Sequence, residues 1–355
     1  MYKGFIKPIL FLIDPERVHR LVVIAVKIVA SIPGAKQLIR NYLNYKHPVL
    51  KTTVAGLHFE NKVGLAAGFD KNADSFSDFS MFGFSFLEIG TVTPLPQPGN
   101  RKPRLFRLPA DNALINRMGF SNKGVEYAAG RLRNRDHSII VGGNIGKNTL
   151  TPNEKAAEDY LRCFLALYEV VDYFTVNVSC PNIKDMAELQ DPESLRDILN
   201  KIMKARSEKQ VNKPVFLKIS PDLTFKQIDE TLAIYREVRL DGIIATNTTT
   251  DRNCLVTGEE FINQAGSGGL SGSPLKNRTL EIIRYICKHS NNSIPVIGVG
   301  GIINTNDALD MIKAGASLVQ VYTGFIYEGP LIVRRINKAI AQYYLLENPG
   351  KIEIS

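Results

Sequence analysis

The sequence is poor in the residues that bind metals or form disulfides. Its 355 residues include only four cysteines and five histidines. The cysteines are widely spaced and form no CxxC pair, which argues against a disulfide framework, a zinc ribbon and an iron–sulfur cluster held by this chain alone. The histidines are scattered and show no ligand spacing such as HxxxH. We therefore expect an intracellular protein with reduced cysteines and no bound metal.

The sequence also lacks a long hydrophobic run near its start. The unbroken apolar stretch 21–26 lies between Arg20 and Lys27, far short of the ~20 residues that a membrane-spanning helix needs. No small-residue cleavage site follows it, so a signal peptide is not expected. The same region predicts two helices. A short one covers the apolar residues 5–12, and a longer one begins at Asp14-Pro15-Glu16 and ends at Pro33-Gly34.

Two interpretations of residues 1–45 remain open. The helices could pack as a hairpin on their own domain, or they could form a module that lies in a membrane interface. The segment is apolar and basic and has no polar core face, which favours the membrane module. The chain has 44 Lys+Arg against 35 Asp+Glu, a net charge of +9. That balance suits an anionic membrane, nucleic acid or an acidic substrate, and composition does not choose among them.

From residue 46 onward the pattern predicts one domain, 46–355, built as an α/β protein. After a small hairpin over 52–60, eight short β-rich runs alternate with helical segments, which predicts a (β/α)8 TIM barrel. The runs are 63–67, 86–90, 139–144, 173–178, 215–219, 242–246, 294–299 and 318–322. Three connections are long, 91–138, 179–192 and 247–273. Each leaves the carboxyl end of its strand, where barrel enzymes keep their active sites.

Glycine-rich turns predict a phosphate site on this face. The seventh strand runs into Gly298-Val299-Gly300-Gly301, the eighth into Tyr322-Thr323-Gly324, and a third turn covers 268–272. Loops after strands seven and eight of barrels commonly bind phosphate. No GxGxxG fingerprint is present, so a Rossmann-type dinucleotide site is unsupported. The combination favours a mononucleotide cofactor such as FMN.

Asparagines gather at the predicted strand ends. A carboxamide offers both a donor and an acceptor, which matches an imide ring with alternating N–H and C=O groups. A pyrimidine-like ligand is therefore expected. The asparagines are Asn116, Asn144, Asn177, Asn182 and Asn247.

Six ordered motifs resemble those of dihydroorotate dehydrogenases, and the resemblance runs from about residue 5 to about residue 340. The N-terminal Asp14-Pro15-Glu16-Arg17-Val18-His19 resembles the quinone-dependent, membrane-bound class 2. The six motifs begin at Ala66 (AAGFDK), Asn116 (NRMGF), Asn144 (NIGKN), Asn177 (NVSCPN), Ala245 (ATNTT) and Gly298 (GVGG).

The resemblance implies an enzyme that oxidises (S)-dihydroorotate to orotate in de novo pyrimidine (UMP) biosynthesis. Hydride would pass to FMN and electrons to a membrane quinone. The protein would associate peripherally with the cytoplasmic face of the cell (inner) membrane through residues 1–45. It would need neither nucleic acid nor an iron–sulfur partner subunit.

The resemblance also implies roles for individual residues. FMN would be bound by Ala67, Gly68, Lys71, Thr91, Asn144, Asn177, Lys218, Thr246, Gly272, Gly301, Tyr322 and Thr323. Dihydroorotate would be bound by Lys71, Asn116, Arg117, Met118, Gly119, Phe120, Asn177, Asn182, Asn247 and Thr248. The quinone tunnel would be lined by His19, Arg107 and Tyr322. A cation such as Lys218 beside the flavin would stabilise the negative charge of its reduced form.

The residue that matches the family's catalytic base is Cys180. Class 2 enzymes usually have serine there, and cysteine is similar to the soluble class 1. A thiol titrates near ~8.5, closer to neutrality than a hydroxyl, and needs less help to act as a base. The N-terminal helices outweigh this departure and favour quinone. A soluble fumarate-dependent dihydroorotate dehydrogenase, another FMN-dependent barrel oxidoreductase and a non-catalytic membrane-binding module remain as alternatives.

Overall fold

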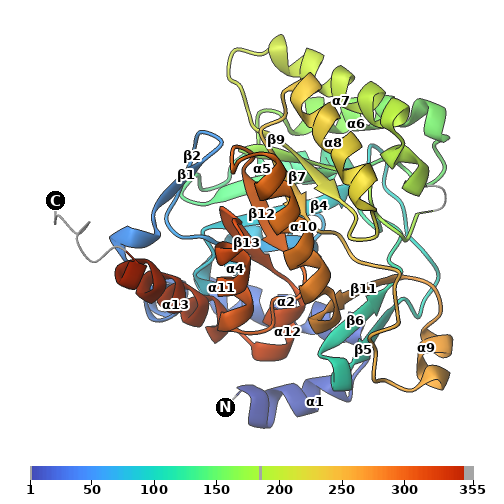
Figure 1. The fold of residues 1–355 in the computed structure, drawn as a ribbon. Helices are drawn as coiled ribbons and strands as arrows, with labels where there is room; N and C mark the ends of the chain where they lie inside the picture. Colours follow the sequence, from blue (N-terminus) through green and yellow to red (C-terminus); the bar gives the residue numbers. More distant parts are fainter. Residues whose placement is uncertain (1, 184–185, 348–355) are drawn as a thin grey trace.

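Eight parallel strands form a closed barrel in the computed structural model, which describes residues 2–183 and 186–347 (Figure 1). Each strand pairs with the next barrel strand along the chain, and the last pairs with the first. The (β/α)8 fold and all eight predicted strands are confirmed, with bounds shifted by up to three residues. The strands are β3 (Val63–Asp70), β4 (Phe86–Val92), β7 (Ile140–Ile145), β8 (Tyr173–Asn177), β9 (Val215–Ile219), β10 (Gly242–Ala245), β12 (Val296–Val299) and β13 (Leu318–Val321).

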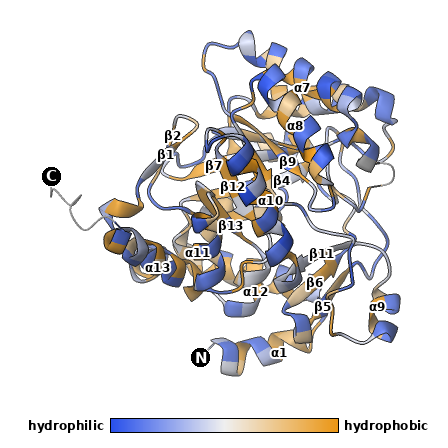
Figure 2. Cartoon of the chain, in the orientation of Figure 1, coloured by the Kyte–Doolittle hydropathy of each residue, from blue (hydrophilic) through white to orange (hydrophobic). Residues whose placement is uncertain are grey.

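Helices cover the outside of the barrel. Figure 2 shows apolar residues along the barrel strands and polar residues on outer helices such as α7 and α8. This is the pattern expected when each helix buries one face against a sheet. The helices are α4 (Phe76–Phe79), α5 (Val125–Leu132), α6 (Ala156–Leu167), α7 (Pro192–Ser207), α8 (Phe225–Val238), α10 (Lys276–His289), α11 (Thr305–Lys313), α12 (Thr323–Glu328) and α13 (Leu331–Glu347). Short 3-10 turns are η2 (Pro48–Leu50), η3 (Ser80–Phe82), η4 (Pro109–Asp111), η5 (Asn153–Lys155), η6 (Met186–Gln190) and η7 (Ser273–Leu275).

Inside the barrel, glycines on one strand make room for aromatic rings on the next. The paired residues Gly142 and Tyr173 show the fit, since a Cβ on the glycine would lie 2.2 Å from the tyrosine Cζ. Gly64 with Phe86 and Gly242 with Phe216 repeat it. The result is a dense layer of large and small residues that fills the barrel centre.

The predicted hairpin closes the end of the barrel where the strands begin. The structure confirms it as β1 (Thr52–Val54) and β2 (Leu57–Phe59). Val54 and Phe59 belong to the same buried cluster as the barrel residue Phe86. The rings of Phe59 and Phe86 meet edge to face at 5.2 Å. Any ligand must therefore enter from the opposite end, where the strands reach their carboxyl ends.

The long connections form a small sheet that the sequence did not predict. Strands β5 (Leu105–Leu108) and β6 (Ala113–Asn116) follow β4, and β11 (Gly269–Gly272) follows β10. They pair antiparallel in the order β11-β6-β5, beside helix α9 (Glu259–Ala265). Each strand has only four residues, and the pairing joins two connections that are distant in the sequence. A local sequence pattern therefore does not predict this sheet.

The N-terminal segment lies beside this small sheet. It consists of one π-helical turn, η1 (Tyr2–Ile6), followed by α1 (Lys7–Phe11), α2 (Pro15–Ser31) and α3 (Ala35–Leu43). The predicted cap of α2 is confirmed, because the Asp14 side chain accepts from Arg17 N at 2.9 Å. Helix α3 was not predicted. Within the described residues no single helix is long and apolar enough to cross a membrane; α2 and α3 meet that test only as a pair bent by 110°.

Candidate active site

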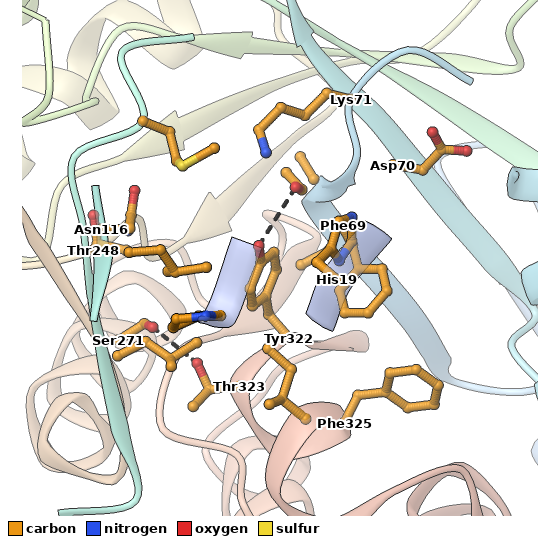
Figure 3. Close-up of a pocket in the computed structure, with 18 of the residues that line it drawn as sticks. His19, Phe69, Asp70, Lys71, Asn116, Thr248, Ser271, Tyr322, Thr323 and Phe325 are labelled. Carbon is orange, nitrogen blue, oxygen red and sulfur yellow. Dashed lines mark hydrogen bonds between the residues drawn. The ribbon is translucent and has the colours of Figure 1, made fainter. Parts of the chain in front are cut away.

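One cavity of about 850 Å³ extends from the carboxyl ends of the barrel strands to helices α1 and α2. Figure 3 shows part of its wall, with side chains from β3, from the start of α12 and from α2 converging on one space. Most of the predicted site residues line it: His19, Ala67, Gly68, Lys71, Thr91, Arg107, Asn116, Met118, Gly119, Phe120, Asn177, Cys180, Asn182, Lys218, Thr246, Asn247, Thr248, Gly272, Gly301, Tyr322 and Thr323.

Two lysines that line this cavity have ammonium groups without a direct ion pair. Lys71 follows β3 and Lys218 belongs to β9, and neither ammonium group forms a hydrogen bond or ion pair with any residue that the structure describes. Burial lowers the pKa of Lys71 to about 8 and lowers the pKa of Lys218 as well. Asp70 turns away from Lys71 (Figure 3) and accepts from the Asp74 and Ser75 backbone N–H groups. Buried unpaired cations are costly, so the site fits an anionic ligand.

Four of the predicted asparagines meet at the cavity in two hydrogen-bonded pairs. Asn182 Nδ2 donates to Asn116 Oδ1 at 2.9 Å, and Asn247 Nδ2 donates to Asn177 Oδ1 at 3.0 Å. They come from β6, from the end of β8 and from the loops after β8 and β10. The structure thus brings together side chains that are up to 131 residues apart in the sequence, from Asn116 to Asn247. Amide groups arranged in this way match the mixed donors and acceptors of a pyrimidine-like ring.

Cys180 lies in the loop after β8 and lines the same cavity. It is buried, and burial raises the pKa of its thiol to about 11, although Asn182 and the charge of Lys218 act to lower it. The loop removes the sulfur from water, so the pKa of this thiol lies above the ~8.5 of a free cysteine. Residues 184–185 of this loop lie outside the described residues.

The predicted phosphate turns converge where α12 begins. Ser271 and Thr323 share a hydroxyl hydrogen bond of 2.8 Å. At Gly272 and Gly301 the φ angles are +105° and +84°, in the region that favours glycine. A Cβ at Gly301 would lie 2.3 Å from Lys276 Cα, so only glycine allows the turn to approach α10 this closely. Such glycine turns beside a hydroxyl suit a phosphate.

Two predicted site residues do not line the cavity. Asn144 is fully buried behind it and contacts Thr91 Oγ1 at 2.5 Å through its Oδ1. The Arg117 side chain stacks over Phe106 and donates to the carbonyl of Ala265 at 2.8 Å. The motifs that contain them reach the site, but neither side chain touches the space where a ligand would lie.

The predicted quinone residues surround the N-terminal end of the cavity. The His19 ring meets Phe69 edge to face at 5.0 Å, and Phe69 meets Tyr322 at 5.4 Å. Arg107 on β5 stacks over Phe11 and donates to the carbonyl of Ile13 at 2.7 Å. Burial lowers the pKa of His19 to about 4, so its imidazole is neutral at pH 7. Apolar side chains such as Leu10, Val22 and Phe325 line this end of the cavity as well, which suits a hydrophobic ring ligand.

Sequence reasoning missed two polar residues inside the barrel, Glu88 and Gln320. Glu88 is 1% exposed and Gln320 is fully buried, and Gln320 Nε2 donates to Glu88 Oε2 at 2.8 Å. The sequence did contain a sign of Glu88, which is the one charged residue in the apolar run FLEIG. Burying a carboxylate is costly unless it has polar partners, so such a residue points to a polar network inside the barrel.

Comparisons with known proteins give the family of the chain. The family model described as dihydroorotate dehydrogenase matches residues 49–344. The chain belongs to this family. Members use a flavin cofactor, and the resemblance drawn from the six motifs is thereby confirmed.

Curated relatives and solved structures agree with this assignment. "Dihydroorotate dehydrogenase (quinone)" of Christiangramia forsetii is 49% identical over 96% of this chain and 99% of its own length. The protein of the same name from Gloeobacter violaceus is 46% identical over 94% and 92%. The ligand-free enzyme of Eimeria tenella superposes with a TM-score of 0.83, at 35% identity, over 95% of this chain and 96% of that one. Its crystal structure with ferulenol gives the same TM-score at 34% identity, covering 95% and 93%.

Proposed function

We propose that this chain oxidises dihydroorotate to orotate with FMN bound at the barrel mouth, and that a quinone is reduced beside the N-terminal helices. The observation that supports this most directly is the continuity of one cavity. Cys180 and Lys218 line its barrel end, and His19 and Arg107 line its helical end. The relatives named above are quinone-dependent dihydroorotate dehydrogenases.

Residues at the barrel mouth fit the two ends of FMN. The turns at Gly272 and Gly301, with the hydroxyl of Thr323, would hold the phosphate, and Lys218 would lie beside the ring. When bound, FMN supplies an acceptor for hydride from substrate C6 and a donor of electrons to quinone. Lys218 would then stabilise negative charge on the cofactor, for which its unpaired ammonium is suited.

The asparagine pairs would orient the substrate. Asn116 with Asn182, and Asn177 with Asn247, present carboxamide edges to the ring N–H and C=O groups. Lys71 would pair with the substrate carboxylate, which explains a buried ammonium that has no ionic partner among the described residues. Fixed in this way, the C5–C6 bond would lie between the base and the cofactor.

Cys180 would take the proton from C5. Its thiolate is the active form, and Lys218 is the cation that favours that form. Asn182 also acts to lower the pKa of the thiol, through its backbone and its side chain. The sulfur holds the proton while C6 loses hydride, which leaves the C5=C6 double bond of orotate.

Residues 1–45 would form the membrane and quinone module, and residues 46–355 would form the FMN-binding barrel. Residues 348–355 lie outside the described residues. Large apolar side chains on and between the N-terminal helices are exposed, with Leu12, just after α1, at 89% and Leu38 on α3 at 72%. Arg20 and Lys27 on α2 are exposed as well. An apolar surface rimmed by basic residues suits peripheral binding to an anionic bilayer, here the cytoplasmic face of the inner membrane.

An anaerobic experiment tests the proposal. Dihydroorotate added to the purified yellow protein should bleach the flavin absorbance, and a quinone should restore it. Fumarate and NAD serve as competing acceptors. Restoration by fumarate alone would replace the quinone assignment with the soluble, fumarate-dependent activity that cysteine at position 180 resembles. A flavin that dihydroorotate does not bleach would reject the substrate.

A further inference from the structure

We propose that Glu88 is a positioning residue of the cofactor site: its buried carboxylate fixes the amide orientations of Asn144 and Gln320 and balances the charge of Lys218. The proposal rests on the flavin site proposed above and assigns a role to a residue that does not line the cavity. Glu88 lies on β4, inside the barrel and below the mouth.

Three donors converge on this carboxylate. Asn144 Nδ2 donates to Oε1 at 2.7 Å, Tyr173 Oη donates to Oε2 at 3.1 Å, and Gln320 Nε2 donates to Oε2 at 2.8 Å. These donors come from β7, β8 and β13. A group that only accepts satisfies all three, which is the pattern of an ionised carboxylate.

The contact with Asn144 determines which way its amide faces. Because Nδ2 is bound to Glu88, Oδ1 must face Thr91, whose hydroxyl donates to it at 2.5 Å. Asn177 Nδ2 then donates to Thr91 Oγ1 at 2.9 Å, and Asn247 donates to Asn177. Glu88 therefore begins a chain of oriented polar groups that ends at two of the asparagines lining the cavity.

The contact with Gln320 leaves an acceptor free. Gln320 lines the cavity and is fully buried, and its Oε1 has no hydrogen-bond partner among the residues that the structure describes. A buried acceptor without a partner is unfavourable, so this oxygen marks a place for a donor. Since Nε2 is held by Glu88, the amide cannot turn over, and Oε1 stays available for an N–H donor of a bound ring.

Charge supplies the third part of the argument. The negative charge of Glu88 favours the ammonium form of Lys218, against the burial that disfavours it. The two groups therefore offset one another inside the barrel. If the carboxylate became a neutral amide while Lys218 stayed protonated, the net potential at the cofactor would become more positive and would stabilise the negative charge of the reduced flavin.

Glu88→Gln tests the proposal with almost no change of volume. The Nε2 group of the new glutamine would face the N–H donor of either Asn144 or Gln320. Two donors cannot bond to each other, so one of these two amides must turn over. We expect the FMN dissociation constant of the reconstituted apoprotein to rise by about tenfold, the equivalent of one lost hydrogen bond. The flavin midpoint potential should shift to more positive values. Tyr173→Phe is the matched control, because it removes one donor and leaves the carboxylate and both amides in place.

A rescue variant separates positioning from a general effect on the core. In Glu88→Gln with Gln320→Glu, the new amide donates to the new carboxylate, so the pair is complementary again and its charge is kept. FMN affinity should return to within about threefold of the unmodified protein. If Glu88→Gln does not fold, Gln320→Leu replaces it, and should weaken FMN binding by about tenfold.

Three results would overturn the proposal. Glu88→Gln could lower thermal stability while FMN affinity and midpoint potential stay unchanged, the rescue variant could bind FMN no better than Glu88→Gln, or Gln320→Leu could bind FMN normally. Failure of the proposed function looks different, because the unmodified protein would then bind no flavin or would not be bleached by dihydroorotate.

Discussion

Glu16 on helix α2 and Arg104, immediately before β5, form a two-pronged ion pair. Arg104 Nη2 lies 2.9 Å from Glu16 Oε1, and Nε lies 3.3 Å from Oε2. Arg104 also donates to the carbonyl of Asn100 at 3.0 Å, and Asn100 Nδ2 donates to the carbonyl of Asn182 at 3.2 Å. The N-terminal helices are thus connected to the loop that contains Cys180.

Glu16→Gln should therefore loosen α2 without damaging the barrel mouth. We expect the KM for quinone to rise about tenfold, or about 1.4 kcal/mol, while flavin reduction by dihydroorotate changes by less than about threefold. Stopped-flow measurement of the two half-reactions separates these effects. Lys102→Gln is the control, because Lys102 meets the same carboxylate at 3.2 Å but is 53% exposed and should contribute little. Equal losses in both half-reactions would contradict the assignment.

The Glu16 pair should also respond to acid. Burial tends to raise the pKa of Glu16, but hydrogen bonds from Arg104 and Lys102 hold it at about 2. A carboxyl with a depressed native pKa stabilises the fold above its unfolded value, about 4.5, and loses that contribution as pH falls toward 2. The unmodified protein should therefore lose more stability than Glu16→Gln between pH 4.5 and 2, measured by urea unfolding at each pH.

Flavin reduction should depend on pH through Cys180. Because burial raises the pKa of the thiol to about 11, the thiolate fraction grows about tenfold per pH unit below that value. The rate of flavin reduction should rise with pH through the neutral range and show no plateau near 8.5. Cys180→Ala should retain orotate binding and lose about 10²–10⁴ in rate. Cys180→Ser should also be much slower. A rate independent of pH in the unmodified enzyme would remove the thiol from this role.

His19 should destabilise the protein in mild acid. Burial, and then the charge of Lys71, lower the pKa of His19 to about 4. The unfolded chain, with a pKa of about 6.5, binds a proton first as pH falls, so stability decreases between pH 6.5 and 4. The full loss is roughly 3 kcal/mol. His19→Gln should flatten that part of the stability curve, whereas His58→Gln on the exposed hairpin should leave it in place.

Much of the fold could be predicted from the sequence because each barrel strand is a short, continuous apolar run. Runs such as Val215–Ile219 are buried at every position, so they differ sharply from their neighbours. The sheet β5-β6-β11 was not readable, since Leu270 pairs with Ile115, 155 residues earlier in the sequence. Helix α3 was missed for another reason. It has only nine residues, and the exposed Leu38 and Tyr42 stand beside the core-facing Ile39 and Leu43, so apolar residues on both sides of the helix obscure the helical period.

The sequence motifs predicted which segments of the chain form the site, but not which way each side chain in them points. The asparagine cluster follows from residue type and strand ends, and the structure brings four of its members together. The motifs could not show that Arg117 turns outward or that Asn144 lies behind Thr91, because neighbours on one strand face opposite sides. Nor could they pair Glu88 with Gln320, which is 232 residues away.

Membrane binding should depend on the exposed apolar face of the N-terminal helices. Leu12 and Ile28 are 89% and 60% exposed. Leu12→Glu or Ile28→Glu should each lower the affinity for anionic vesicles by about tenfold, measured by cosedimentation, because each places a charge in the bilayer interface. Val211→Glu is the control, since Val211 is 65% exposed before β9 on the barrel. Equal binding by all variants would leave the helices as a hairpin packed on the barrel, the alternative that the sequence left open.

Gly142→Ala should be among the most damaging small changes in the barrel. The added Cβ would lie 2.2 Å from Tyr173 Cζ and 2.5 Å from its hydroxyl oxygen, and the ring cannot retreat because Phe216 packs against it at 5.5 Å. We expect a loss of about 3 kcal/mol in the free energy of unfolding, together with release of the Tyr173–Glu88 hydrogen bond. Gly130→Ala on α5 has open space around the same added carbon and should stabilise by about 0.5–1 kcal/mol. Urea unfolding of both variants distinguishes the two sites, and similar values would mean that the barrel centre is less densely packed than its geometry requires.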